Sequence, residues 1–141
     1  MNFIFAKLFE EYIRKNDPAE FKIAAYITVF YFMLLFILIL PIKTYVDKKI
    51  FENEIHYEKT SVTYFIFGLL ILIFFLVYNF YIKKKYIYNI VKKNKNRKIN
   101  KIALYLLIMS IPSSFLLLGG IITVYLCGGE VLGQQIKGLL E

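Results

Sequence analysis

The stretch that decides the fold is FIFGLLILIFFLV, which runs from Phe65 to Val77. Apart from Gly68, its 13 residues are all Phe, Ile, Leu or Val, and it lies in an uncharged run over residues 62–82. About 18 consecutive apolar residues suffice to cross the hydrocarbon core of a bilayer. The twelve apolar residues of the stretch together favour insertion by roughly 4 to 7 kcal/mol. We therefore predict a membrane-spanning helix here.

Two more uncharged runs, residues 23–40 and 102–127, have the same character. None of the three runs shows the polar face that a helix of a soluble bundle carries at a period of 3.6 residues. Hydrophobic residues make up 59% of the chain, against about 45–50% in soluble domains. Because backbone groups in lipid must bond internally, the runs are expected to be helices. The sequence thus predicts an all-α integral membrane protein, a single membrane domain over residues 1–141 with three transmembrane helices at about 18–40, 62–82 and 102–127.

Amphipathic segments flank these runs at both ends of the chain. In the lead, residues 3–15, one helical face gathers Phe5, Leu8, Phe9, Tyr12 and Ile13. Such a helix either lies in the membrane interface or packs on the protein's own loops, and the sequence leaves both readings open. The tail, residues 130–141, has a similar pattern and is predicted to be an amphipathic helix on the membrane surface.

The second and third spans carry features beyond their length. Ile82, Tyr86 and Ile90 continue a helical stripe past the second apolar run, which predicts one helix from residue 62 to residue 93. Pro112 lies inside the third run and is expected to kink it, because proline lacks the amide that the helix needs.

The formal net charge of +8 is concentrated in one segment. Nine of the 18 Lys and Arg residues lie in the segment 83–101, which has no acidic residue, and the rest of the chain balances to −1 (nine basic, ten acidic). Positive loops stay in the cytoplasm. An amino terminus inside puts thirteen basic residues in the cytoplasm and five outside, so we expect the carboxyl terminus outside. The excess of lysine over arginine, 16 to 2, is typical of an AT-rich bacterial genome, so the membrane is expected to be the bacterial inner membrane.

These nine residues are also candidates for contact with anionic lipid, at about 1 kcal/mol each. A purely topogenic flank with snorkelling lysines is the favoured alternative, and nucleic acid is a distant third, because 19 residues cannot build a nucleic-acid-binding fold. The candidate lipid contacts are Lys83, Lys84, Lys85, Lys92, Lys93, Lys95, Arg97, Lys98 and Lys101.

The third run has a small-residue surface suited to close helix packing. It is therefore the candidate for contact with a membrane partner, and its members are Ser110, Pro112, Ser114, Gly119 and Gly120.

The sequence lacks the motifs that are typical of metal binding, nucleotide binding and catalysis. His56 is the sole histidine and has Glu52 and Glu58 nearby, but a dedicated zinc site needs three or four converging ligands, so no metal is expected. There is no phosphate loop or dinucleotide pattern, and no Asp, Glu, Lys, Arg or His lies in the three runs. We expect neither an enzyme nor a cofactor.

Three features together carry a resemblance: the segment Tyr12-Ile13-Arg14-Lys15-Asn16-Asp17-Pro18 before the first span, the basic loop 83–101, and a third span. In architecture the whole chain resembles a group of small three-span bacterial membrane proteins, some of which are regarded as immunity factors against toxins. The resemblance implies a non-enzymatic protein that binds a membrane partner or another copy of itself, as an immunity protein, regulator or accessory subunit. The alternative is an oligomeric pore-forming or membrane-perturbing effector.

Overall fold

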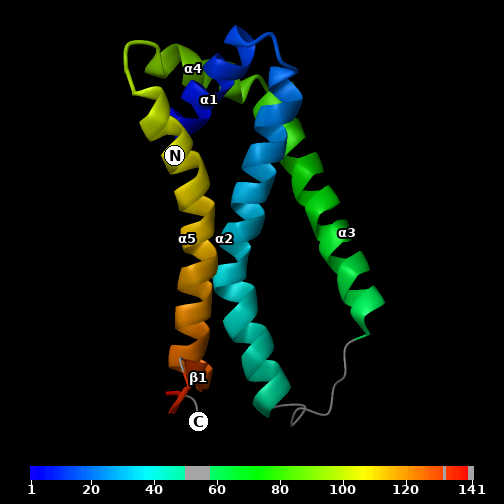
Figure 1. Cartoon of the computed structure of the whole chain (residues 1–141). Helices are drawn as coiled ribbons and strands as arrows, with labels where there is room; N and C mark the ends of the chain where they lie inside the picture. Colours follow the sequence, from blue (N-terminus) through cyan, green and yellow to red (C-terminus); the bar gives the residue numbers. More distant parts are fainter. Residues whose placement is uncertain (50–57, 132, 140–141) are drawn as a thin grey trace. The chain divides into compact units, whose positions relative to one another are not determined.

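A computed structural model describes residues 1–49, 58–131 and 133–139 (Figure 1). The chain divides into two compact units. The first unit comprises residues 1–32 and 66–111, and the second comprises residues 33–65 and 112–141. In chain order the elements are α1 (Asn2–Arg14), α2 (Ala19–Lys49), α3 (Lys59–Val77), the π-helix η1 (Tyr78–Lys83), α4 (Tyr86–Asn94), α5 (Lys101–Cys127), β1 (Gly129–Val131) and β2 (Gln134–Ile136).

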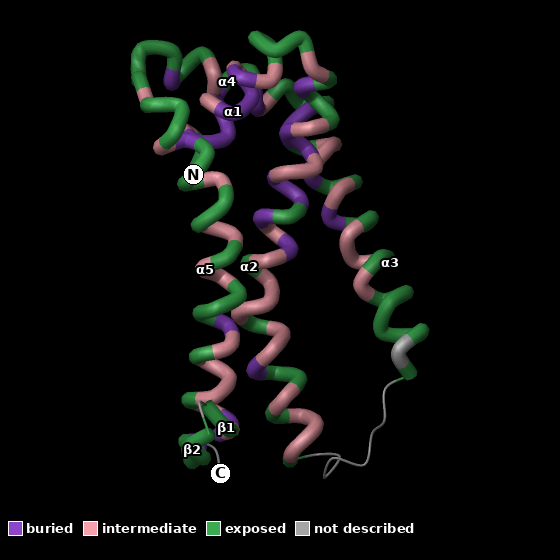
Figure 2. Tube along the Cα trace, viewed as in Figure 1, coloured by how far each residue is buried: buried purple, intermediate pink, exposed green. Residues whose placement is uncertain are grey.

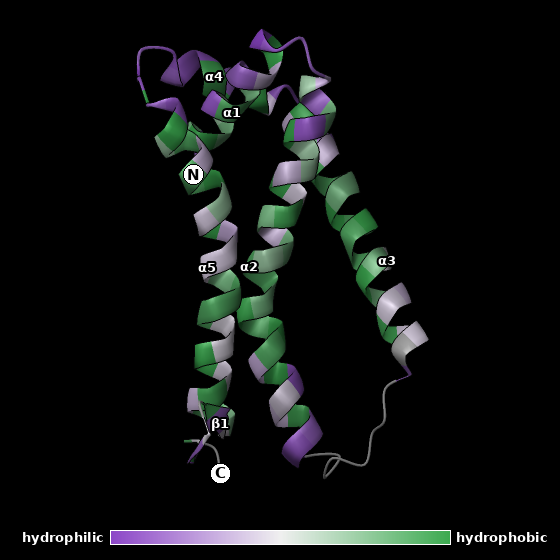
Figure 3. Cartoon of the chain, viewed as in Figure 1, coloured by the Kyte–Doolittle hydropathy of each residue, from purple (hydrophilic) through white to green (hydrophobic). Residues whose placement is uncertain are grey.

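Three helical segments of the described chain are long and apolar enough to cross a membrane, as the sequence predicted. They are Ala19–Lys49, Thr60–Lys83 and Lys101–Cys127. Figure 3 shows their apolar character as green ribbon along α2, α3 and α5. The mostly helical fold with three helices of spanning character is thereby confirmed. Insertion into a membrane and the kink at Pro112 remain predictions; α5 continues as one helix past Pro112.

The helix α2 runs nine residues beyond the predicted end of the first span, through Pro41 to Lys49. Local contacts stabilise this extension. Thr44 Oγ1 donates to the Leu40 carbonyl at 2.9 Å, and Lys43 pairs with Asp47 one turn later. The buried thiol of Cys127 donates to the Pro41 carbonyl at 3.7 Å.

The prediction of one continuous helix over residues 62–93 is wrong. The chain passes from α3 into the π-helical turn η1, and Lys85 then adopts a left-handed conformation (φ 54°) that ends the helix. The Tyr86 ring packs edge-on against Tyr81 at 5.4 Å, and Ile87 is fully buried. Because α4 lies against α1, its apolar stripe is buried on the protein itself, which a helix continuing into water could not achieve.

The prediction of an amphipathic helix in the tail is also wrong. Strands β1 and β2 pair antiparallel, with Glu130 opposite Gln135. Gly128 (φ 70°) and Gly133 (φ 80°) both adopt positive φ, which favours a chain break and a tight hairpin turn over helix continuation. Positions 132, 140 and 141 of the tail lie outside the described residues.

The core of the first unit forms around α1. Its residues Phe5, Ala6, Leu8 and Phe9 are at most 1% exposed, and Figure 2 shows α1 largely in the buried colour. The helix packs on α4, which agrees with the reading of the lead as a helix packed on the protein's own segments, and a place in the membrane interface stays a prediction. Ile13, which was expected on the apolar face, is 54% exposed.

In the second unit, α5 approaches the backbone of α2 closely at Gly119. A Cβ atom at Gly119 would lie 3.2 Å from the Phe36 carbonyl oxygen and 3.4 Å from Ile37 Cα. At the neighbouring Gly120 a Cβ would meet nothing within 4 Å. The two adjacent glycines therefore differ: only Gly119 is required by internal packing.

We expect Gly119→Leu to destabilise the protein by about 1–3 kcal/mol, because α2 backbone cannot move aside as a flexible side chain would. Gly120→Leu is the matched control, with the same gain in helix propensity and no neighbouring atom within 4 Å of its new Cβ. Thermal unfolding of both variants in mild detergent checks this difference. Equal unfolding midpoints for the two variants would contradict the close approach.

Candidate functional site

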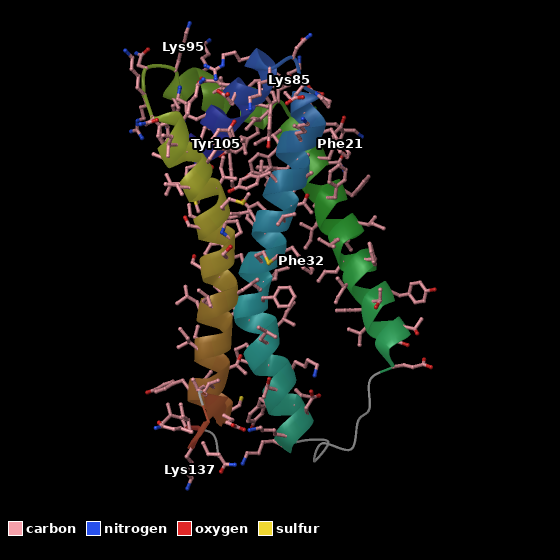
Figure 4. All side chains as sticks on the ribbon, viewed as in Figure 1. Phe21, Phe32, Lys85, Lys95, Tyr105 and Lys137 are labelled. Atoms are coloured by element: carbon pink, nitrogen blue, oxygen red, sulfur yellow. The ribbon has the colours of Figure 1, made fainter. Side chains whose placement is uncertain are left out.

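A basic surface covers α4 and the segments on either side of it. All nine basic residues predicted as lipid contacts, between Lys83 and Lys101, are exposed. Figure 4 shows the side chains of Lys85 and Lys95 pointing away from the helices, and Figure 3 shows this region as hydrophilic. We call these nine residues the basic surface.

The cations of the lead and of the first turn of α2, by contrast, have carboxylate partners. Lys7 lies 2.7 Å from Glu10, and Lys22 lies 2.8 Å from Asp17. Glu11 pairs with Arg14 and also lies 3.9 Å from Lys15. Within the described part of the chain, no member of the basic surface lies within 4.0 Å of a carboxylate oxygen. Among the residues that the structure describes, the basic surface of the first unit therefore lacks close ion pairs, whereas the cations elsewhere in this unit have them.

Glu11 is the buried charge of the lead, only 8% exposed. The hydrogen bond from Arg14 lowers the pKa of its carboxyl below the ordinary value, against the opposing effect of burial. The nearby cations Lys101 and Lys15 lower this pKa further. Glu11 thus gives α1 an electrostatic attraction to the start of α5.

Two tyrosines tie this region to neighbouring helices. Tyr88 of α4 donates to Glu20 Oε1 of α2 at 2.6 Å, and this hydrogen bond raises the pKa of Tyr88 to about 12. Lys15 donates to the hydroxyl of Tyr105 at 2.8 Å, which raises the pKa of Lys15. The basic segment is therefore held by one polar contact to α2 as well as by its apolar contact with α1, and a second polar contact joins the end of α1 to α5.

Two shallow grooves border the basic surface, and Arg97 lines both. One, of about 630 Å³, lies between the first turn of α1 and α4, where Phe3, Tyr86 and Lys93 contribute. The other, of about 390 Å³, lies between α1 and the loop that leads into α5, and Lys7 and Arg14 of α1 line it together with Lys98. Sequence reasoning did not assign Lys7 and Arg14 to this surface, because their proximity follows from the packing of α1, which it left open.

The five predicted helix-contact residues do not share one face of α5. Gly119 is buried against α2, and Pro112 lies on the same side by helical periodicity. Ser110 is exposed and Ser114 half-buried, and both belong to the opposite face by the same periodicity. Gly120 borders open space. Only part of the predicted surface is thus accessible to another helix.

Candidate metal ligands are dispersed in the described ranges. No group of three or more His, Cys, Asp or Glu residues that could hold a metal occurs there. His56 and Glu52 lie outside the described residues, whereas Glu58 is described and exposed. No protein-family model, curated protein or solved structure matches this chain.

The lowered pKa of Glu11 predicts an acid-sensitive contribution to stability. A carboxyl whose pKa is depressed on folding stabilises the fold above its unfolded pKa and loses that contribution as pH falls through the folded value. We expect the unfolding midpoint to fall between about pH 5 and pH 3, with a flatter profile and a lower neutral midpoint in Glu11→Gln. Circular dichroism melts across this range measure both curves. Parallel curves would contradict the role of Glu11.

Proposed function

We propose that the chain is a non-enzymatic, multi-pass protein of the bacterial inner membrane that binds a helix of another membrane protein, or of a second copy, through α5. An immunity protein, a regulator or an accessory subunit would act in this way. The observation that carries the proposal is burial. Only 11% of the most apolar window of α5 is buried within the described chain, against 33% for α2 and 22% for the span that contains α3.

The outward face of α5 has the composition of a helix contact. Ser110, Ser114, Leu117 and Ile121 fall on one side by helical periodicity, and Leu117 and Ile121 are 68% and 65% exposed. Gly120 at the edge of this face leaves room for a second backbone. Helices in lipid associate through small residues and close packing, because lipid supplies no hydrophobic driving force between them.

The packing of α1 on α4 agrees with the proposed three spans, and charge supplies the proposed orientation. In a three-span chain the lead and the second loop lie on the same side of the membrane, and the basic surface belongs on the cytoplasmic side. The amino terminus is then cytoplasmic, and the hairpin of β1 and β2 lies outside.

The alternative function, an oligomeric pore, predicts rapid depolarisation when the chain is expressed, whereas helix binding predicts an unchanged membrane potential.

Gly120→Leu tests the proposed contact, with Gly68→Leu on α3 as its matched control. Both glycines are helical, and a Cβ at either meets nothing within 4 Å. A photo-crosslinking residue replaces Leu117 in the wild-type chain and in both variants. We expect a protein adduct of discrete mass in the wild-type and Gly68→Leu chains, reduced by about tenfold in Gly120→Leu, because a bulky side chain prevents close approach.

The mass of the adduct separates a second copy of the chain from another protein, and either supports the proposal. An adduct that persists in Gly120→Leu, or adducts with lipid alone, would refute it. Unfolding midpoints of the variants confirm that the substitutions leave the fold intact.

A further inference from the structure

We propose that the groove between α1 and the loop leading into α5 binds the phosphate of an anionic phospholipid headgroup. This site is narrower than the basic surface, because only part of that surface lines the groove. The residues that contribute the binding charge, here called the groove cations, are Lys95, Arg97, Lys98 and Lys101.

The groove cations differ from the other cations that line the groove, because they have no close carboxylate partner in the described chain. On the α1 wall, Lys7 is paired with Glu10 and Arg14 with Glu11. The two pairs leave that wall close to neutral. The groove cations have no carboxylate oxygen within 4.0 Å in the described part of the chain. The groove thus presents four positive charges without a close ion-pair partner, although Glu11 also attracts Lys101 at longer range, and an anion with several oxygens can be shared among them.

The apolar lining of the groove favours a lipid over a free anion. Ile99 is half-buried and Leu104 is 3% exposed, and both line the groove beside the cations. Inorganic phosphate gains no binding energy from an apolar wall. The glycerol and upper acyl carbons of a phospholipid would cover this wall and remove its apolar surface from water.

The position of the groove at the start of a candidate span also favours a phospholipid headgroup as the ligand. Helix α5 begins at this point: the Asn100 carbonyl accepts from the Leu104 amide at 2.9 Å, and Asn100 Oδ1 accepts from the Ile102 amide at 3.1 Å. In a spanning helix this end lies at the level of the headgroups. Basic pockets at the cytoplasmic ends of spans are typical binding sites for anionic headgroups.

The groove inference does not depend on the helix contact at Gly120. The two proposals concern different residues and different ligands. Loss of the protein adduct in Gly120→Leu leaves the groove unchanged, and removal of groove cations leaves Gly120 unchanged.

The experiment compares two double variants of the full chain in mild detergent. Lys95→Gln/Lys98→Gln removes two groove cations, and Lys83→Gln/Lys92→Gln removes two lysines of the basic surface that do not line the groove. All four side chains are exposed, so both variants are expected to fold. Intrinsic tyrosine fluorescence reports the unfolding midpoint during titration with short-chain phosphatidylglycerol, short-chain phosphatidylcholine or inorganic phosphate. The single variant Lys98→Gln replaces the groove variant if the latter is unfolded without lipid.

We expect phosphatidylglycerol to stabilise the wild-type and control chains equally and to bind the groove variant roughly thirtyfold more weakly. Phosphatidylcholine and inorganic phosphate should shift none of the midpoints. Unchanged affinity in the groove variant would overturn the proposal. So would an equal loss in the control, which indicates diffuse charge, or equal stabilisation by inorganic phosphate, which indicates a free-anion site.

Discussion

The docking of α1 is the interaction on which the first unit depends. The Phe5 ring, 1% exposed, packs edge-on against Tyr26, Phe30 and Tyr81 at 5.4–6.2 Å between ring centroids, and so connects α1 to both α2 and η1. One turn later, Phe9 packs against Tyr88 of α4 at 5.3 Å. Because α1 offers this apolar surface, α4 folds onto it instead of extending the second span. The break at Lys85, the grooves and the placement of the basic surface all follow from that packing.

Neighbouring segments of the first unit differ in whether their cations have carboxylate partners. The cations of the lead and of the first turn of α2 serve the fold, since Glu10, Glu11 and Asp17 pair with them locally. The basic surface has no such partners in the described chain, so its charge is available to the membrane or to a ligand. Lys7 thus pairs with a carboxylate, whereas Lys98 has none within 4.0 Å in the described chain. A formal net charge of +8 for the whole chain conceals this division.

The sequence was sufficient to predict the features that depend on long, uniform patterns of residues. It was insufficient to predict those that depend on single contacts in the fold. The apolar stretch from Phe65 to Val77 predicts a spanning helix because lipid allows no other backbone solution. Lys85 carries no glycine or proline signal, so its left-handed conformation arises from packing that a linear pattern does not contain. Gly119 and Gly120 are adjacent and chemically identical, and only the position of α2 separates the internal contact from the open one. The glycines of the tail were visible, but an apolar spacing compatible with a helix obscured their turn-forming role.

The central claim is that three helices cross the membrane and that charge orients them, with the basic surface in the cytoplasm and the tail outside. Its most direct test is the accessibility of single cysteines to a maleimide that does not cross membranes. In a Cys127→Ser background, Lys95→Cys and Lys137→Cys place one thiol at each exposed position (Figure 4). We predict that Lys137→Cys is labelled in intact cells and Lys95→Cys only after the inner membrane is permeabilised. Labelling of both thiols from one side, or the reverse pattern, would contradict the claim.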